Sequence, residues 1–478
     1  MDIVAAAAGV SGKATLTVGP PIPVSIAITP ATATLVRGGR QQYQAAGTMT
    51  DGSIQDVTAS VAWSVGDSGI ASVVAPGLIA GGPSGGTTGV RAESGAVAGD
   101  AALTVRPQRI AFVSSRKGNG NLATWLESGG ASGLVGADAV CTRLAASARL
   151  PGRYVAWLSD ANDDAWCRVQ GLSGKRSSGC SAGTPTTAGP WIGMDGLPFA
   201  PVLEELSAGR TILPLRLDET GRPVADATRV LTATLPDGTL NLVGSPPCAN
   251  WSASFPPASP MGGVVGGVMS YWTDYAGVDC AGTHALACLE VAPGNGAALE
   301  PFAQAGKVVF VTSRSGTGQL SGWTDAGGRE GIPAGDAICQ AAATRAGLPR
   351  ASSFKAFLSD TSRNAVDRLT TDGPWIRVDG APVAGNRAAL ASGALFAPIS
   401  VDENGRPVGG LNDPVSHWTA WTGTGERGLS TGRHCGDWKA GSGALGEIGV
   451  AIIGLSDWSY FQFVSCDAWI AALYCFED

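Results

Sequence analysis

The chain has 478 residues, of which 44% are hydrophobic and 15% charged, and its formal net charge is −7. This apolar content is too high for a disordered chain and is enough for about three domain cores. The acidic balance argues against duplex nucleic acid as a partner, because phosphate binding requires a clustered positive face. No apolar run is long enough to span a membrane.

The first segment, residues 1–21, resembles a single β-strand taken from a larger domain. Residues 9–19 (GVSGKATLTVG) echo residues 95–105 (GAVAGDAALTV), the last strand predicted for the domain that follows. We therefore interpret 1–21 as the orphan terminal strand of a preceding domain of the same type. Such a strand either frays or adds to the exposed edge of a neighbouring copy. The start has no positively charged region and no long apolar run, so no signal peptide is visible.

Residues 22–106 show evenly spaced short strands. Val24, Ile26 and Ile28 alternate with small polar or short side chains, and Gly-Gly and Asp-Gly pairs mark turns. This pattern predicts a β-sandwich. The segment ITPATATLVRGGRQQYQAAGTMTDGSIQDVTASVAWSV, followed by GLIAGG and DAALTV, resembles the bacterial immunoglobulin-like group 2 domain. The resemblance implies a stalk module of a bacterial surface protein.

The rest of the chain is an internal duplication. The segment DAVC ending at Cys141 matches DAIC ending at Cys339, and GPWI recurs at 189–192 and 373–376. The spacing predicts two whole domains, repeat 1 (107–291) and repeat 2 (307–478), joined by a linker rich in Ala, Pro and Gly over 292–306. In each repeat an Ala-rich helix, near 136–149 and 334–348, precedes short strands and long loops.

Both repeats resemble endostatin and its bacterial relatives, which have a C-type-lectin-like fold. The segments that carry the likeness in repeat 2 are GIPAGDAICQAAATRAGLPRASSFKAFLSD and HWTAWTGTGERGLSTGRHCGDWKA, with the ending FVSCDAWIAALYCFE. The resemblance implies an α+β fold for each repeat. The expected fold class is therefore mainly β, with one Ig-like β-sandwich and two endostatin-like α+β domains.

The ten cysteines indicate a disulfide framework. The four cysteines of repeat 2 allow three connectivities, between which spacing cannot choose. The resemblance implies nested bridges, and Cys167 and Cys180, which have no counterparts in repeat 2, pair most simply with each other. The expected bonds are Cys141–Cys288, Cys248–Cys280, Cys167–Cys180, Cys339–Cys475 and Cys435–Cys466. Such use of cysteine favours an oxidising compartment, so we expect an exported protein at the cell surface or outside the cell.

No constellation for catalysis is evident. Only three histidines occur, and none belongs to a recognisable nucleophile–base pair. The adjacent pairs Asp218-Glu219 and Asp402-Glu403 invite a glycosidase interpretation, but a turn before Gly-Arg-Pro is favoured over it. We expect no enzyme and no cofactor.

Neither a metal nor a polyanion is expected to bind. The calcium-binding motifs of C-type lectins and the histidine cluster of endostatin are missing, so no metal site is expected. Each repeat carries more acidic than basic residues, 15 against 12 over residues 110–291 and 17 against 14 over residues 307–478, so the heparin-binding patch of endostatin does not carry over.

Aromatic residues between the later cysteines are the candidate ligand contacts, because these segments differ between the repeats. They are Tyr271, Trp272, Tyr275, Trp458 and Tyr460. The function expected is that of a bacterial surface binding or adhesion protein, in which an Ig-like stalk presents two lectin-like domains to a glycan or a surface protein. The alternatives are a self-associating subunit of an extracellular filament or surface layer, and an enzyme of unknown type.

Overall fold

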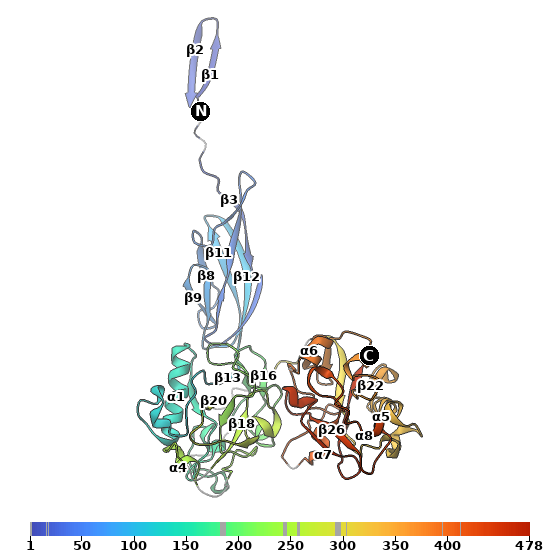
Figure 1. Ribbon diagram of the computed structural model, residues 1–478. Coiled ribbons are helices and arrows are strands. Elements are labelled where there is room, and N and C mark those ends of the chain that lie inside the picture. Colours follow the sequence, from blue (N-terminus) through green and yellow to red (C-terminus); the bar gives the residue numbers. More distant parts are fainter. Residues whose placement is uncertain are drawn as a thin grey trace. The chain divides into compact units, whose positions relative to one another are not determined.

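The computed structural model describes residues 2–478 with short gaps. The residues outside the description are 16, 18, 182–187, 242–245, 256–258, 292–297, 303, 394 and 412. The chain divides into two compact units, Met1–Pro107 and Gln108–Asp478 (Figure 1). Part of the linker predicted over 292–306 lies outside the described residues.

The first unit begins with a two-stranded hairpin, β1 (Asp2–Ala7) and β2 (Val10–Thr15), paired antiparallel from Asp2↔Thr15 to Ala7↔Val10. The sequence predicted a lone strand here, whereas the structure gives that strand a partner from the residues just before it. All twelve strand residues are exposed, so the hairpin has paired backbone groups but buries no apolar face.

Residues 23–106 form a β-sandwich around one core. Alternate residues of the long strand β12 are buried, among them Leu103 and Val105, and they pack against Tyr43, Ile79 and Val90. The sheets have the orders β4-β12-β11-β8, β3-β6-β7 and β5-β10-β9. The strands are β3 (Pro23–Thr29), β4 (Thr32–Val36), β5 (Arg40–Gln42), β6 (Gln44–Met49), β7 (Ile54–Asp56), β8 (Ala62–Val65), β9 (Ala71–Ala75), β10 (Leu78–Gly81), β11 (Gly86–Ser94) and β12 (Val97–Arg106).

The second unit contains two eight-stranded sheets of identical topology. The order in repeat 1 is β16-β15-β13-β20-β17-β18-β19, and in repeat 2 it is β24-β23-β21-β28-β25-β26-β27; β14 and β22 pair with β20 and β28. The strands of repeat 1 are β13 (Arg109–Val113), β14 (Arg153–Ala156), β15 (Trp191–Ile192), β16 (Pro198–Ala200), β17 (Arg229–Leu231), β18 (Met261–Val264), β19 (Ala276–Gly277) and β20 (Ala285–Val291). Those of repeat 2 are β21 (Lys307–Val311), β22 (Phe354–Ala356), β23 (Trp375–Arg377), β24 (Pro382–Ala384), β25 (Thr419–Trp421), β26 (Leu445–Val450), β27 (Gln462–Ser465) and β28 (Ala472–Glu477).

One long helix packs on each sheet, and both form near the predicted places: α1 (Gly133–Ser147) and α5 (Gly331–Arg345). The central strands β20 and β28 are buried on both faces, which explains their continuous apolar sequences. In β28, Leu473 and Cys475 face the core beside α5, whereas Tyr474 and Phe476 face a second core. The short helices are α2 (Ala165–Arg168), α3 (Leu203–Ser207), α4 (Cys248–Trp251), α6 (Arg387–Ala391), α7 (Val415–Trp418) and α8 (Cys435–Trp438).

Five disulfide bonds hold the repeats, and they are the five pairs expected from the sequence. The outer bonds, Cys141–Cys288 and Cys339–Cys475, tie the long helix to the central strand. The inner bonds, Cys248–Cys280 and Cys435–Cys466, close shorter loops, and Cys167–Cys180 lies in the segment unique to repeat 1. No cysteine is free.

The outer bond of repeat 2 is expected to contribute more stability than the inner bond. Its cysteines are 136 residues apart, against 31 for the inner pair. In the chain-entropy model the two loops correspond to about 5 and about 4 kcal/mol. Replacing Cys339 and Cys475 by Ser should therefore lower the free energy of unfolding by about 1 kcal/mol more than replacing Cys435 and Cys466, as measured by urea titration. An equal or reversed order would contradict this account.

A left-handed turn of four residues recurs in both repeats, at α4 and at α8. The φ angles of residues 248–251 are 44°, 52°, 56° and 63°, and those of residues 435–438 are 52°, 56°, 56° and 64°. Its first residue is held by a disulfide and its last by the indole N–H, which donates 2.8 Å to the carbonyl of Ser159 or Ser359. Left-handed backbone costs non-glycine residues roughly 1–2 kcal/mol each, so these bonds maintain the turn against local strain.

Replacing the exposed Ala249 by Gly should stabilise repeat 1 by about 0.5–1 kcal/mol. Glycine adopts this backbone conformation without steric cost, and repeat 2 already has Gly436 at the same place. The reciprocal Gly436→Ala should destabilise repeat 2 by a similar amount, and the shift in urea midpoint measures both. Destabilisation by Ala249→Gly would show that the turn is not strained.

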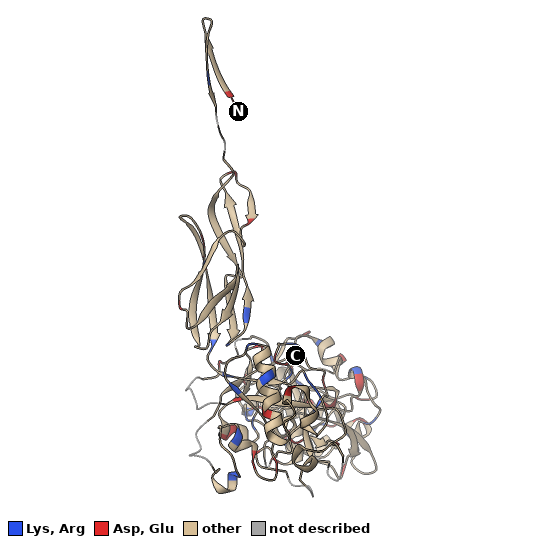
Figure 2. Ribbon diagram, turned by 90° about the vertical axis from the view of Figure 1, so that its left-hand side faces the viewer, with Lys and Arg blue, Asp and Glu red and all other residues tan. Residues whose placement is uncertain are grey.

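Charges of both signs are distributed over the second unit, and Figure 2 shows basic and acidic residues interspersed along its ribbon. Within the described part of the chain, no helix has the length and apolar character needed to cross a membrane.

Candidate functional site

Two of the five aromatic residues predicted to contact a ligand are core residues instead. Trp272 is 4% exposed and packs against Trp157 and Phe199, and Trp458 is 1% exposed and packs against Phe357. Both side chains belong to hydrophobic core clusters, so neither ring is accessible to a ligand in this structure. Tyr460 is exposed.

Tyr271 and Tyr275 lie where the two repeats meet. Their rings contact each other edge to face with centroids 4.7 Å apart, and Tyr271 also contacts Trp418 of repeat 2 at 5.6 Å. The hydroxyl of Tyr275 donates a hydrogen bond of 3.3 Å to Asp457. These two tyrosines therefore contact the other repeat, which the sequence did not predict.

The meeting of the repeats, which we call the seam, is built from equivalent segments. In repeat 1 Gly263 packs directly against the carbonyl oxygen of Trp272, so that a Cβ added to this glycine would lie only 1.9 Å from that oxygen. In repeat 2 Gly449 packs in the same way against the carbonyl oxygen of Trp458, also at 1.9 Å from an added Cβ. A pair of backbone hydrogen bonds shows the same equivalence: the N–H of Tyr275 donates to the Gly262 carbonyl, and the N–H of Phe461 donates to the Ile448 carbonyl. Residues of these two segments thus correspond at a constant offset of 186.

Two of the backbone hydrogen bonds that cross the seam are related by a pseudo-twofold axis. The N–H of Val268 donates 2.9 Å to Ile452, and the N–H of Gly454 donates 3.0 Å to Gly266. Val268 corresponds to Gly454 and Gly266 to Ile452, so each bond is the image of the other. Gly267 forms a β-bridge with its own counterpart, Ile453. This is the isologous geometry of a twofold dimer, here within one chain.

Apolar packing and polar contacts reinforce the seam. Leu213, Val264, Val268 and Met269 of repeat 1 belong to the same core cluster as Ile452, Trp458 and other residues of repeat 2. The Nη1 atom of Arg216 donates 2.7 Å to the Leu395 carbonyl.

The seam contains an open cavity of about 340 Å³, which we call the seam groove. Repeat 1 contributes Asp226, Ala227, Arg229, Val264 and Tyr275, and repeat 2 contributes Ser392, Gly393, Leu455, Ser456 and Asp457. A second cavity of about 200 Å³ shares Ser392, Gly393 and Ser456 with it and adds residues that include Glu426, Arg427 and Ser459. Because the two cavities share these three residues, they adjoin each other.

The groove holds charged groups in a partly desolvated environment. The Arg229 guanidinium lies over the Tyr275 ring at 4.3 Å, and its Nη1 atom is buried with no hydrogen-bond partner among the described residues. Burial raises the pKa of the Asp457 carboxyl, although its bond with Tyr275 acts in the opposite direction. A cavity lined by a guanidinium, a phenol and a carboxylate is suited to a ligand that offers hydrogen-bond acceptors and donors.

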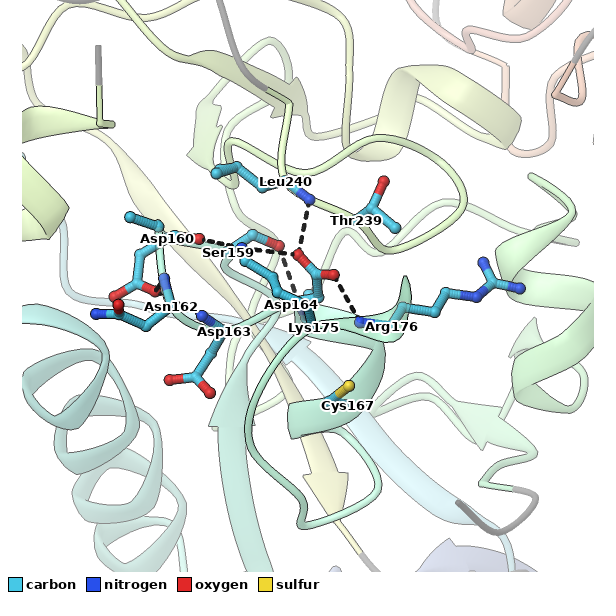
Figure 3. A network of polar contacts seen from close by, with 12 residues as sticks. Ser159, Asp160, Asn162, Asp163, Asp164, Cys167, Lys175, Arg176, Thr239 and Leu240 are labelled. Carbon is cyan, nitrogen blue, oxygen red and sulfur yellow. Dashed lines mark hydrogen bonds and ion pairs between the residues drawn. The ribbon is translucent and has the colours of Figure 1, made fainter. Parts of the chain in front are cut away.

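A polar network in repeat 1 is structural by comparison (Figure 3). Asp164 accepts hydrogen bonds from the backbone of Leu240 at 3.0 Å and Arg176 at 2.9 Å, and pairs with Lys175 at 3.1 Å. Lys175 also donates 2.6 Å to the carbonyl of Asp160. These bonds anchor the segment that carries Cys167–Cys180, and they leave Asp164 and Lys175 engaged within the protein.

The paired carboxylates form turns, in agreement with the preferred interpretation. Asp218 accepts from the backbone of Thr220 and Arg222, and Asp402 accepts from Asn404 and Arg406. The adjacent Glu219 and Glu403 accept from the backbone of Ser115 and Ser313, at 3.0 and 2.8 Å. Among the residues that the structure describes, no three His, Cys, Asp or Glu side chains gather as a metal site.

Comparison with known proteins identifies the domain of the first unit. Residues 24–105 match the family of bacterial Ig-like domains (group 2). This segment is a bacterial Ig-like domain. Ice-binding protein 1 of Shewanella frigidimarina (strain NCIMB 400) is 32% identical over 163 residues, which are 34% of this chain and 17% of that protein. The matched segment thus spans about a sixth of that relative.

Solved structures of surface-layer proteins share a small part of the chain. Domains 4 and 5 of the S-layer protein SbsC are 17% identical and cover 20% of this chain and 58% of that one, with a TM-score of 0.16. The S-layer protein rSbsC(31-844) is 16% identical and covers 22% of this chain and 16% of that one, with a TM-score of 0.17. Scores this low support no inference about the fold.

Residues of the groove that the sequence analysis missed include Arg229, Ser392, Ser456 and Asp457. One sequence signal was available, because the loop after the Gly-Arg-Pro-Val motif differs in length between the repeats. It spans 225–227 in repeat 1 and 409–417 in repeat 2.

Substituting two aromatic candidates should separate core packing from surface exposure. Trp458→Ala should cost about 3–5 kcal/mol, because it leaves a cavity in the core that the repeats share. Tyr460→Ala should cost less than about 1 kcal/mol, because its side chain is exposed. Urea unfolding measures both, and comparable losses would contradict the assignment.

Proposed function

We propose that this chain belongs to an exported bacterial surface protein whose two-repeat unit binds a ligand without turnover. The observation that carries the proposal is the seam groove, an open cavity between the repeats that is lined by the side chains of Arg229, Tyr275 and Asp457. The Ig-like domain serves as a stalk, the role in which such domains occur in surface proteins. The five disulfides support export, because such bonds persist in oxidising compartments.

The endostatin-like, C-type-lectin-related character of the repeats is part of the same proposal. A long helix tied by an outer disulfide to the central strand, with an inner disulfide in the loop-rich region, supports it. Ligands of two classes are consistent with the polar groove, a glycan and a surface protein.

The main rival is a structural subunit that assembles through these repeats. The edge strand β27 favours it, because Phe463 is 50% exposed there and Phe461 precedes it with 39% exposure. Unprotected strand edges with apolar side chains invite pairing between copies. Concentration-dependent growth of the solution mass of the purified chain would support this rival.

Binding of the full chain to a glycan array and to a library of linear peptides tests the proposed function. The expected result is binding that Ser392→Trp removes, because an indole on this exposed groove residue blocks the cavity. Ser442→Trp is the matched control, an exposed serine of the same repeat outside the groove. A ligand that binds the unmodified chain, the Ser392→Trp variant and the Ser442→Trp variant equally would contradict the proposal. Failure to find any ligand would contradict it as well.

Binding should also be independent of metal. Because we expect no metal site, EDTA should leave both the binding and the melting temperature unchanged. The melting temperature reports on a bound ion, since such an ion would stabilise the fold by mass action. A drop in melting temperature on chelation would overturn this expectation.

A further inference from the structure

The pseudo-twofold axis relates the seam groove to an equivalent site on the other flank of the seam. At that second site the chain's own backbone occupies the space. On the other side of the pseudo-twofold axis, the longer loop of repeat 2 lies against repeat 1. The N–H of Leu411 donates 3.3 Å to the Ala208 carbonyl, and the N–H of Ser270 donates 3.3 Å to the Gly409 carbonyl. The space above Gly209 is occupied by Gly410 and Leu411, whose backbone atoms lie 2.8–3.3 Å from a Cβ built there.

The groove presents the equivalent residues without the loop. Ser392 and Gly393 correspond to Ala208 and Gly209, because the N–H groups of Ser392 and Ala208 donate to Ala388 and Glu204, each four residues earlier. Repeat 1 supplies three residues, 225–227, where repeat 2 supplies nine, 409–417, a difference of six. The three atoms nearest to a Cβ on Gly393 all belong to Ser456 of the same repeat, whereas the three nearest to a Cβ on Gly209 belong to the other repeat.

A hydrogen-bond donor in the groove is left open by the missing loop. Ser456 corresponds to Ser270, whose N–H is bonded to Gly409 on the filled side. No described residue accepts from the Ser456 N–H, which begins the short 3-10 helix Ser456–Trp458. The groove therefore offers a backbone donor at the position where its counterpart receives a peptide carbonyl.

We propose that the seam groove binds an extended, glycine-containing segment of another polypeptide, which lies as residues 409–411 lie on the filled side. A carbonyl of the segment accepts from the Ser456 N–H, as the Gly409 carbonyl accepts from the Ser270 N–H on the filled side. Small residues are required because the segment passes over Gly393, as Gly410 passes over Gly209. This inference rests on the proposed binding function and names the ligand class, a peptide rather than a glycan.

The substitution Ser456→Pro tests the backbone bond directly. Proline removes the N–H and is tolerated at the first position of a helix, and the preceding Leu455 is already extended, with φ −97° and ψ −175°. A phage-displayed library of linear peptides, including the sequence of residues 408–415, is selected on the full chain. For the best peptide, Ser456→Pro should raise the Kd about tenfold, the loss expected for one buried hydrogen bond. Ser456→Ala, which keeps the N–H, should change it less than about twofold.

A loop graft provides a second test that does not depend on proline. Replacing residues 225–227 by the sequence of 409–417 should fill the groove from within and abolish peptide binding, with an unchanged far-ultraviolet spectrum. Peptide binding that survives the graft, or that responds equally to Ser456→Pro and Ser456→Ala, overturns the inference. If no peptide is selected but a glycan binds and Ser392→Trp abolishes that binding, the inference is overturned and the proposed function still holds. If neither class binds, both fail.

Discussion

The pair of backbone hydrogen bonds between residues 266–268 and 452–454 is the contact on which the architecture of the second unit depends. It joins equivalent segments of two repeats across a pseudo-twofold axis, and apolar side chains from both sides close around it. Buried backbone groups must be paired, so this short stretch can leave solvent only in the presence of its partner. The two repeats therefore form one packed unit with a shared core, and they are not separate domains joined only by a linker.

Symmetry explains most of the seam, and its exceptions are informative. A strictly twofold interface would fill or open both flanks alike. Here residues 409–411 pack on repeat 1 and Trp418 packs against Tyr271, whereas the short loop 225–227 leaves the opposite flank open. Asp457 stands where repeat 1 has Tyr271, so the open flank is also the more polar one. Duplication followed by unequal loop length is a simple way to create a concave site.

Rigidity is supplied in the same way in both repeats. A disulfide and a Trp indole hold each left-handed turn, and the outer disulfide ties the long helix to the buried central strand. Strained backbone persists only where surrounding bonds fix it. The groove residues Ser456 and Asp457 directly precede Trp458 in the chain, and Trp458 is buried in the core. The packing of Trp458 therefore holds the backbone of these two groove residues in position. A preformed site of this kind loses little conformational entropy on binding.

The sequence by itself determined the Ig-like sandwich and the duplication, because these depend on patterns that repeat or alternate locally, whereas the cysteine pairs were implied by the resemblance to endostatin. Alternation at Ile26 and Ile28 specifies a half-buried strand wherever the strand lies, and both side chains are buried. Matched cysteines show that the two repeats share a framework, but spacing left three connectivities open. Only the tertiary structure decided which aromatic residues are buried, because Trp272 and Trp458 lie in segments whose direction is set by distant packing. It also decided that Val10–Thr15 pairs with Asp2–Ala7, and that residues 184 to 188 positions apart meet at a seam. Neither periodicity nor composition contains that information, because contacts between separate repeats arise from shape, and shape follows only once both cores have formed.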